Sequence, residues 1–346
     1  MTSAVMDKPV MVNPVVGASV FGRIKAVRQA IVAELRKVIV GEDEQIEQVL
    51  TALFAGGHCL IQGPPGTAKT ALIATLARVV DLQFKRIQFV PDLMPADISG
   101  TEILEEDQKT GRRIIKFVKG PVFANILMAD EINRTPPKTQ AALLEVMQEK
   151  QVSIGGQTYP LPQPFYVLAT QNSMEQEGTY PLPEAQQDRF MLSILMDYLP
   201  VDSEITVVRR STGLQTSDLQ RVIGGEELMQ FVQAVRSVTL PPLIGQYVVD
   251  LVAASRPTAP TALPYIKEYV SWGAGLRASQ NIALAAKSVA AQDGRDTIVI
   301  GDVKKAIYPV MRHRIGLSFR AEVDRVSVDS VIEKLIDGVP IPAGLN

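Results

Sequence analysis

Two stretches of the sequence carry residues that suit nucleotide chemistry. The first is a glycine-containing loop between an apolar run and a helical one, Gly63-Pro64-Pro65-Gly66-Thr67-Ala68-Lys69-Thr70. Glycine lets backbone N–H groups turn toward a polyphosphate, and the following helix adds the partial positive charge of its N-terminus. Lys69 would contact the β- and γ-phosphates, and the Thr70 hydroxyl would hold Mg²⁺. The loop therefore predicts a phosphate-binding site.

One position of this loop departs from the usual pattern. A second glycine normally precedes the lysine, and Ala68 stands there instead. Alanine adopts helical dihedral angles readily, so the change is tolerated if Ala68 already belongs to the helix. The alternative is a Gly-Pro turn before a helix that happens to contain Lys-Thr, and a second motif downstream argues against it.

That second motif is an apolar run, Ile126-Leu127-Met128-Ala129, which ends in Asp130 and Glu131. It predicts a strand beside the first one, with the carboxylates at the edge where open α/β sheets bind ligands. Asp130 would orient Mg²⁺ through water, and Glu131 would polarise the water that attacks the γ-phosphate. Alone, the pattern fits a buried strand followed by an acidic turn equally well; paired with the loop, it favours nucleotide hydrolysis.

The elements around these motifs alternate between helical and extended patterns up to about residue 200. Helices are expected at 21–39, 42–55, 70–80 and from an N-cap at Thr135 to about 150, strands at 58–62, 84–89, 126–129, 165–170 and 191–196, hairpins at 101–118 and 152–159, and a loop at 91–97. Beyond Leu199-Pro200 the patterns are helical, at 203–211, 226–238, 242–254, 277–293 and 302–314. We expect an N-terminal arm (1–20), an α/β domain with a doubly wound parallel sheet (21–200) and a smaller all-α domain (201–346).

Composition limits the class of protein. The 346 residues are 46% hydrophobic, enough for two folded domains, but only 5% aromatic, so aliphatic residues must form the core. A net charge of -2 gives no overall attraction to nucleic acid or to an anionic membrane. The single cysteine, Cys59, lies in a predicted strand and is expected to be buried and reduced. No segment has the pattern of a membrane span or a secretory signal, which favours a cytoplasmic protein.

Three further polar residues follow predicted strands or lie at helix ends. Asn172 comes directly after the strand at 165–170, where a side-chain amide could reach the γ-phosphate or the attacking water. Arg189 and Arg277 lie at helix termini. Taken alone, Asn172 reads as a turn residue and the arginines as surface cations.

At this point the sequence resembles the AAA+ ATPases, and within them the MoxR type, from about residue 32 to 316. The resemblance rests on the loop at 63–70, on Pro91-Asp92-Leu93-Met94-Pro95-Ala96-Asp97-Ile98-Ser99-Gly100, on Ala129-Asp130-Glu131-Ile132-Asn133-Arg134, on Ala169-Thr170-Gln171-Asn172, and on 175–190, which ends in Asp188-Arg189-Phe190. The family more often has Ser-Pro where Gly275-Leu276 precede Arg277.

The resemblance assigns roles to these residues. Asn172 is similar to the first sensor and Arg189 to the arginine finger, which acts on the nucleotide of a neighbouring subunit. Arg277 resembles the second sensor in a helical lid, and we expect it to contact the nucleotide of its own subunit. Val40-Gly41 resembles the edge of the adenine site. The hairpins at 101–118 and 152–159 resemble the helix-2 insert and the hairpin before the first sensor.

The resemblance further implies ATP and Mg²⁺ as ligands, a ring that is usually hexameric, and a chaperone role in maturing protein complexes. Partners of such ATPases often carry von Willebrand factor A domains, and this chain has none, so such a partner is a separate protein. Alternatives are a nucleic-acid motor or chelatase-type motor subunit of the same clade, or a module that binds nucleotide without turnover. The basic residues of 109–119 are a candidate client contact, or only a solvated surface; the sequence names no client.

Overall fold

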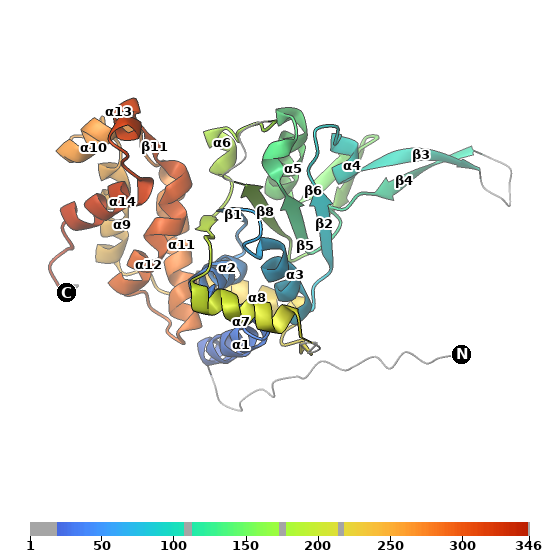
Figure 1. Cartoon of the computed structure of the whole chain (residues 1–346), viewed down its shortest axis with the longest axis horizontal. Coiled ribbons are helices and arrows are strands. Elements are labelled where there is room, and N and C mark those ends of the chain that lie inside the picture. The colour runs from blue at the N-terminus through green and yellow to red at the C-terminus, as the bar shows by residue number, and fades with distance from the viewer. Residues whose placement is uncertain (1–18, 107–112, 173–177, 214–217, 345–346) are drawn as a thin grey trace.

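The computed structural model describes residues 19–106, 113–172, 178–213 and 218–344 (Figure 1). The predicted N-terminal arm therefore lies outside the described residues except at its end, where helix α1 (Val20–Leu35) begins. In this part of the chain, none of the helices combines the length and the apolarity that crossing a bilayer requires.

A five-stranded parallel sheet forms the centre of the first domain, as predicted. Its strands are β1 (Cys59–Gly63), β2 (Phe84–Gln88), β5 (Ile126–Asp130), β8 (Tyr166–Asn172) and β9 (Leu192–Leu195), in the order β2-β5-β8-β1-β9. The chain leaves β1 for the far edge at β2, returns through β5 and β8, and crosses to β9 on the other side of β1. The carboxyl ends of all five strands consequently lie at one edge, where ligands of such sheets bind.

Both faces of the sheet are buried. Along β1 the side chains alternate, so that Cys59 and Ile61 join one hydrophobic cluster and Leu60 joins the other. The first cluster contains α1, α2 (Asp43–Ala55) and α3 (Lys69–Val79), and the second contains α5 (Pro137–Glu149). This double burial explains the nearly continuous apolar runs of the inner strands β1, β5 and β8, and Cys59 is a fully buried core residue as expected.

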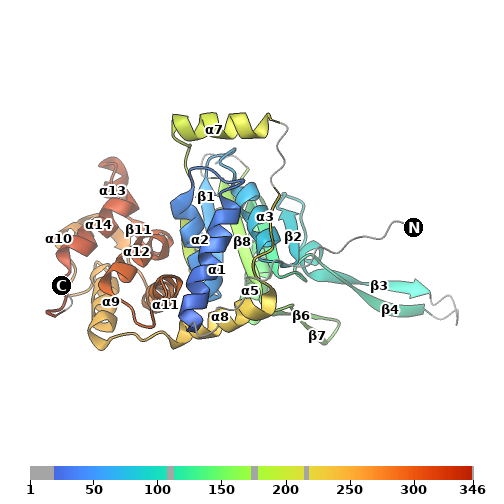
Figure 2. The same ribbon diagram turned by 90° about the horizontal axis from the view of Figure 1, so that it is seen from below.

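Two hairpins project from this domain on the side away from the helical domain (Figures 1 and 2). The longer pairs β3 (Gly100–Glu106) with β4 (Arg113–Lys119), and the shorter pairs β6 (Gln151–Ile154) with β7 (Gln157–Pro160). The rings of Phe117 and Tyr159 stack at a centroid distance of 4.3 Å and join the two hairpins. Both hairpins agree with the predicted ranges.

Two local predictions in this domain are wrong. The expected loop at 91–97 contains the short helix α4 (Pro95–Ser99), because the Asp97 carboxylate accepts a hydrogen bond from Met94 N and caps it. Helix α5 is not capped by Thr135; its N-cap is Pro136, and the buried Thr135 hydroxyl has no hydrogen-bond partner within the described residues.

The C-terminal domain is helical and lies beside the sheet. Its elements are α9 (Pro242–Ala254), α10 (Pro264–Tyr269), α11 (Leu276–Gln292), α12 (Ile300–Met311), the 3-10 turn at Arg312–Arg314, α13 (Phe319–Val323) and α14 (Val328–Gly338). The small antiparallel pair β10 (Val270–Trp272) and β11 (Gly316–Leu317) was not predicted. The short helix α6 (Glu184–Gln187) precedes β9. Helices α7 (Val201–Ser211) and α8 (Gly225–Ser237) connect β9 to the helical domain, and α8 packs against α1 and α2.

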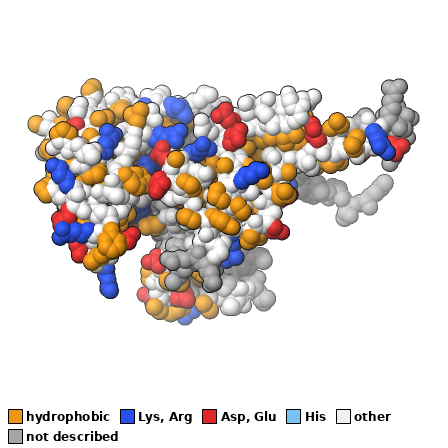
Figure 3. All heavy atoms as spheres, turned by 90° about the horizontal axis from the view of Figure 1, so that it is seen from above, with side chains coloured by type: hydrophobic (Ala, Val, Ile, Leu, Met, Phe, Trp, Pro, Cys, Tyr) orange, Lys and Arg blue, Asp and Glu red, His pale blue; other side chains and the backbone are white. Residues whose placement is uncertain are grey.

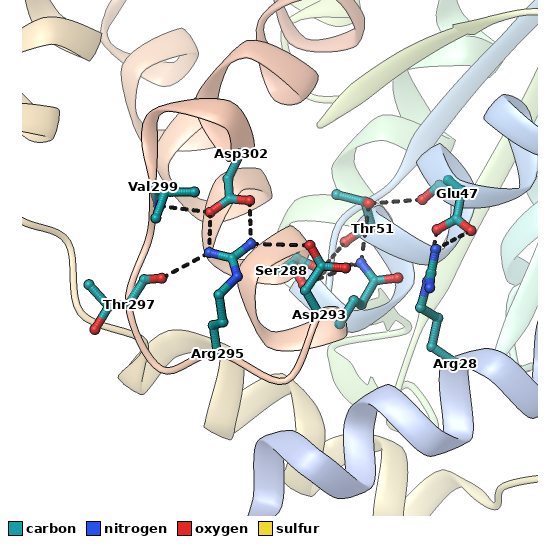
Figure 4. A network of polar contacts seen from close by, with 10 residues as sticks. Arg28, Glu47, Thr51, Ser288, Asp293, Arg295, Thr297, Val299 and Asp302 are labelled. Carbon is teal, nitrogen blue, oxygen red and sulfur yellow. Dashed lines mark hydrogen bonds and ion pairs between the residues drawn. The ribbon is translucent and has the colours of Figure 1, made fainter. Parts of the chain in front are cut away.

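Polar contacts join the two domains along α2 and α11 (Figure 4). Ser288 Oγ donates to the carbonyl of Thr51 at 2.8 Å, and Gln292 Nε2 donates to the Thr51 hydroxyl at 3.2 Å. All three side chains are buried, and α11 also packs on α8 and α9. Buried hydrogen bonds of this kind fix the orientation of α11 relative to the sheet.

Candidate active site

The phosphate loop connects the carboxyl end of β1 to the N-terminus of α3. Lys69 Nζ donates to the carbonyl of Gly63 at 2.9 Å, to that of Pro64, and to the Thr67 hydroxyl at 3.2 Å. Burial lowers the pKa of Lys69, while Asp130 and Glu131 act in the opposite direction. The carbonyl contacts hold the ammonium group at the mouth of the loop, and phosphate oxygens would be stronger acceptors for it.

Ala68 does not belong to the helix, so the condition under which alanine is tolerated there without cost is not met. It is the N-cap of α3 and adopts a left-handed conformation with φ 58° and ψ 18°. A Cβ in this region crowds the following carbonyl oxygen at a cost of about 1–2 kcal/mol, which explains why glycine is usual there. The loop therefore keeps its geometry at the expense of backbone strain.

Asp130 ends β5, and its side chain is held by two neighbouring strands. The Thr170 hydroxyl on β8 donates to Asp130 Oδ1 at 2.5 Å, and Arg86 Nε on β2 donates to Oδ2 at 3.0 Å. The residue is only 8% exposed. Only β8 separates β5 from β1 in the sheet, and the charge of Asp130 raises the pKa of Lys69 against the effect of burial.

Glu131 follows in a left-handed conformation, with φ 55°. Its backbone N–H donates to the Thr170 hydroxyl at 2.9 Å, and its carboxylate accepts hydrogen bonds from Gln88 Nε2 at 2.6 Å and Arg134 Nε at 3.1 Å. Strained conformations of non-glycine residues persist where neighbouring groups impose them, and they gather at functional sites. Here the Thr170 hydroxyl fixes the backbone of Glu131. The Glu131 side chain contacts Gln88, at the carboxyl ends of the strands.

Sequence reasoning assigned no role to Thr170, Arg86 or Gln88. Thr170 lies inside a quoted motif, Ala169 to Asn172, but a threonine in a buried strand gives no chemical signal by itself. Gln88 lies opposite Asp130 in the β2–β5 register, and Arg86 lies two residues earlier on the same strand. Arg86 and Gln88 are polar residues within the predicted strand at 84–89. Polar side chains inside a strand were the signal that could have identified these two residues.

Asn172 lies beside the phosphate loop. It ends β8 opposite Gly63 in the parallel register, and it is 7% exposed. The sequence prediction of its position agrees with this geometry, and its function as a sensor stays a prediction.

The residues predicted to hold Mg²⁺ fit such an ion chemically. Thr70 lies in the first turn of α3, and Asp130 carries a carboxylate at the end of β5. The prediction that this strand lies beside β1 is wrong, because β8 is inserted between the two. A hydroxyl and a carboxylate suit Mg²⁺, which keeps several waters and takes phosphate oxygens as its other ligands. Within the described residues there is no cluster of three or more His, Cys, Asp or Glu that could bind a metal ion.

Val40-Gly41, the predicted edge of the adenine site, faces the connection between β9 and α7. Gly41 has φ 78°, and a Cβ there would approach Leu199 and Ser203 to 3.0 Å, so both conformation and space favour glycine. The same connection runs beside the phosphate loop, because Met196 N donates to Gln62 O at 2.8 Å.

Arg189 and Arg277 lie at the opposite end of β1 from the phosphate loop. Met191 N donates to His58 O, so Arg189 is level with the amino end of β1. Arg277 Nη1 bonds to Asp188 Oδ2 at 3.2 Å, and both arginines line one pocket with His58. A strand of this length spans about 15 Å, so Arg277 does not reach the loop of its own subunit in this structure.

In this structure Arg277 lies away from the phosphate loop of its own subunit, and its role as a lid sensor stays a prediction. The reason for this position is the docking of α11 against α2 and α8, which carries the first turn of α11 to the amino edge of the sheet. The order of the helices along the chain does not reveal which edge of the β-sheet they will lie against.

Comparisons with known proteins agree with this architecture. A family model described as "ATPase family associated with various cellular activities (AAA)" matches residues 58–192, and an AAA lid domain matches 265–335. Chaperone MoxR1 of Mycobacterium tuberculosis is 42% identical over 89% of this chain and 81% of its own length. Protein MoxR of Paracoccus denitrificans is 30% identical over 90% of this chain and 95% of its own.

A crystal structure from Cytophaga hutchinsonii, assigned as a candidate ATPase, superposes with a TM-score of 0.86 at 42% identity. The match covers 93% of this chain and 97% of that one. The α/β domain and the helical lid are thus shared with that structure over nearly the whole length of both chains. The chain belongs to the MoxR family of AAA ATPases.

Proposed function

We propose that this ATPase acts as a ring-forming chaperone that uses ATP and Mg²⁺ to remodel or mature protein complexes. Lys69 and Thr70 would hold the phosphates and the ion, Asp130 would orient the ion, and Glu131 would activate the attacking water. Asn172 would position that water or the γ-phosphate. The chaperone role is supported by the similarity to Chaperone MoxR1.

The observation that carries the ring is the separation of the two halves of the site. The loop lies at the carboxyl edge of the sheet, and Arg189 lies at the amino edge beside Arg277. An arginine that stabilises the transferring phosphoryl group is worth about 10³–10⁵-fold in rate, and here it requires the pocket of another copy. Head-to-tail contacts of this kind close into rings, which we propose to be hexameric.

Arg277 belongs to the same proposed interface. Its guanidinium group is half-exposed and lies next to Arg189 on one face of the chain. We therefore propose that both arginines act on the nucleotide of the neighbouring subunit. In that arrangement the lid of one subunit reports the nucleotide state of the next.

The test mixes two inactive variants, Lys69→Ala and Arg189→Ala. Each removes a different half of the shared site, so mixed rings should regain part of the phosphate release of the wild type. Lys69→Ala mixed with Glu131→Gln is the control, because both changes lie in the same half and no intact site can form. Failure of the first mixture to recover, in samples shown by light scattering to co-assemble, would contradict action between subunits.

The chaperone activity needs a separate readout. Stoichiometric amounts of the protein with ATP should suppress aggregation of a denatured model protein or speed its recovery, and Glu131→Gln should block release of the client. Stimulation of phosphate release by DNA, without any such effect on proteins, would instead support a nucleic-acid motor. A client that carries a von Willebrand factor A domain would appear as a protein retained by Glu131→Gln only in ATP.

A further inference from the structure

Helix α7 presents its apolar side chains away from the rest of the chain. None of its residues is buried, and Figure 2 shows it outside the layers formed by the sheet and the helices that cover it. Val201, Ile205 and Val208 lie on one side of the helix, at i, i+4 and i+7, and are 71%, 44% and 54% exposed. We call these three residues the apolar face of α7. A surface helix normally packs such a stripe against its own domain.

The opposite side of α7, which contacts the protein, is polar. Ser203 lies against Gly41, 3.0 Å from the position that a Cβ would take there. Arg210, seven residues later, donates to the carbonyls of Arg36 and Lys37 at 3.1 Å and 3.5 Å. The helix is therefore held through its polar side, and its apolar face is left uncovered. A helix this short is marginal in water without tertiary packing, so a further surface is needed to cover that face.

Helix α7 lies at the edge of the sheet that carries the phosphate loop. Met196 N donates to Gln62 O at 2.8 Å, directly before the loop, and the chain continues from there into α7. The exposed side chains of Asp202 and Glu204 flank the apolar face in the first turn, and Arg209 flanks it in the last. The end of α7 nearest the loop thus combines an apolar stripe with negative charge.

A surface of matching character lies on the lid, at the opposite edge of the sheet. Trp272, Leu276 and Phe319, within or next to the β10–β11 pair, are 36%, 70% and 80% exposed, and we call them the apolar lid surface. Leu276 directly precedes Arg277, which lines one pocket with Arg189. Apolar side chains and two cations therefore lie on this side of the chain. The length of β1 separates this edge from the one that carries α7, so the lid does not cover α7 of its own chain.

We propose that the apolar face of α7 binds the apolar lid surface of a second copy of this chain. The proposal rests on the proposed ring and names the surfaces that form it. Asp202 and Glu204 would then approach the side that carries the neighbour's two arginines, and opposite charges there favour this pairing over others. Each copy uses α7 on one side and its lid on the other, which is the head-to-tail contact that a closed ring requires. The same contact brings the arginines toward the phosphate loop.

Cross-linking tests this contact directly, because the only cysteine of the chain, Cys59, is fully buried. Ile205→Cys and Leu276→Cys on separate chains, mixed in ATP and Mg²⁺ and treated with a short bismaleimide, should give a covalent dimer. Mass spectrometry should identify one chain of each kind in it. Val20→Cys mixed with Leu276→Cys is the matched control: Val20 is also 44% exposed, but it lies at the far end of α1, about 24 Å from the end that contacts α7. Equal dimer yields in the two mixtures would overturn the proposal.

A triple variant, Val201→Ser with Ile205→Ser and Val208→Ser, tests assembly. Changes at exposed positions seldom alter folding, which circular dichroism checks, and ATP affinity should stay near that of wild type because this face points away from the chain. At concentrations where light scattering finds wild type assembled, the variant should be dissociated. Its phosphate release should fall by about 10-fold or more and recover as protein concentration rises, since the arginine comes from the neighbour. Val249→Ser, at a 51% exposed position of α9, should follow wild type.

A triple variant that assembles as wild type does would contradict the proposal. Normal assembly with lost suppression of aggregation would assign the apolar face of α7 to a client, and so would also overturn it. If the triple variant is unfolded, the cross-linking result decides. The mixture of Lys69→Ala with Arg189→Ala tests the ring independently. Its recovery together with a failed cross-link rejects the α7 contact alone, whereas its failure rejects the ring itself.

Discussion

Arg314 Nε and Asp188 Oδ1 lie 2.7 Å apart across the contact between the lid and the sheet domain. Arg314 is 1% exposed, and its Nη2 also donates to the carbonyls of Asp188 and Phe190, the two residues that flank Arg189. A buried guanidinium group of the lid therefore holds the segment that carries the proposed arginine finger.

Replacing Arg314 with Ala should affect both stability and hydrolysis. Breaking a buried pair costs about 3–5 kcal/mol, and the lower value applies because Asp188 keeps 32% of its side chain exposed. ATP affinity should stay near that of wild type while phosphate release falls, since the loop at the other sheet edge is untouched. Chemical denaturation measures the loss of stability, and calorimetry measures ATP affinity. Arg314→Lys keeps the positive charge but loses the several N–H donors of the guanidinium group, so its stability and phosphate release should lie between those of wild type and Arg314→Ala. Unchanged hydrolysis would mean that Arg189 needs no such support.

Lys69→Ala and Glu131→Gln should separate binding from hydrolysis. Loss of the ammonium group that neutralises phosphate charge should abolish ATP binding in the first variant. The second should bind ATP and hydrolyse it about 10²–10⁴-fold more slowly, because the amide cannot accept a proton from water. Calorimetry and phosphate release distinguish the two, and near-normal turnover by Glu131→Gln would place the base elsewhere.

Thr170→Val should disturb both carboxylates at once. The change removes the donor to Asp130 and the acceptor for Glu131 N, and leaves buried polar groups unpaired at a cost of about 1–3 kcal/mol. Higher Mg²⁺ should be needed for half-maximal phosphate release. Thr170→Ser retains the hydroxyl and is the matched control. Equal Mg²⁺ dependence in the two variants would limit Thr170 to a structural role.

Ala68→Gly should stabilise the protein. The left-handed conformation of Ala68 costs about 1–2 kcal/mol, and glycine removes this strain while adding about 0.5–1 kcal/mol of chain entropy on unfolding. A net gain of about 0.5–1 kcal/mol is expected in urea denaturation, with ATP affinity unchanged or higher. A loss of stability would show that the loop relaxes around Ala68 without strain.

Changes on the long hairpin should leave the basal ATPase intact and weaken client protection. Leu104 and Ile115 are paired across β3 and β4 and are 70% and 69% exposed, and hydrophobic side chains along this arm are visible in Figure 3. The double change Leu104→Ser with Ile115→Ser removes this apolar pair. Phosphate release and suppression of aggregation are the two measurements, and unaltered suppression would exclude the pair from client contact.

The predicted basic surface of this hairpin is only partly described. Lys109 and Arg112 lie outside the described residues. Two of the described cations of β4 face acidic residues of β3: Lys116 pairs with Glu105 at 2.8 Å, and Arg113 lies opposite Glu106. The charges of residues 109–119 alone do not show these acidic partners, because Glu105 and Glu106 belong to the other strand of the hairpin.

Local sequence determined the phosphate loop, the acidic strand end and the order of helices and strands. Each of these depends on residues adjacent in the chain: a glycine-containing turn before a helix, an apolar run before Asp130, or a periodicity that selects helix or strand. The parallel sheet followed as well, because strands alternating with helices have few other ways to bury both faces.

Only the tertiary structure decided which residues meet across the site. Thr170 joins Asp130 and Glu131 because β8 lies next to β5, and Arg314 supports Arg189 from a distance of more than a hundred residues in sequence. Arg277 lies at the amino edge of the sheet because α11 docks on α2 and α8. Docking of one domain on another depends on complementary surfaces from distant segments, so no local pattern in the sequence reveals it.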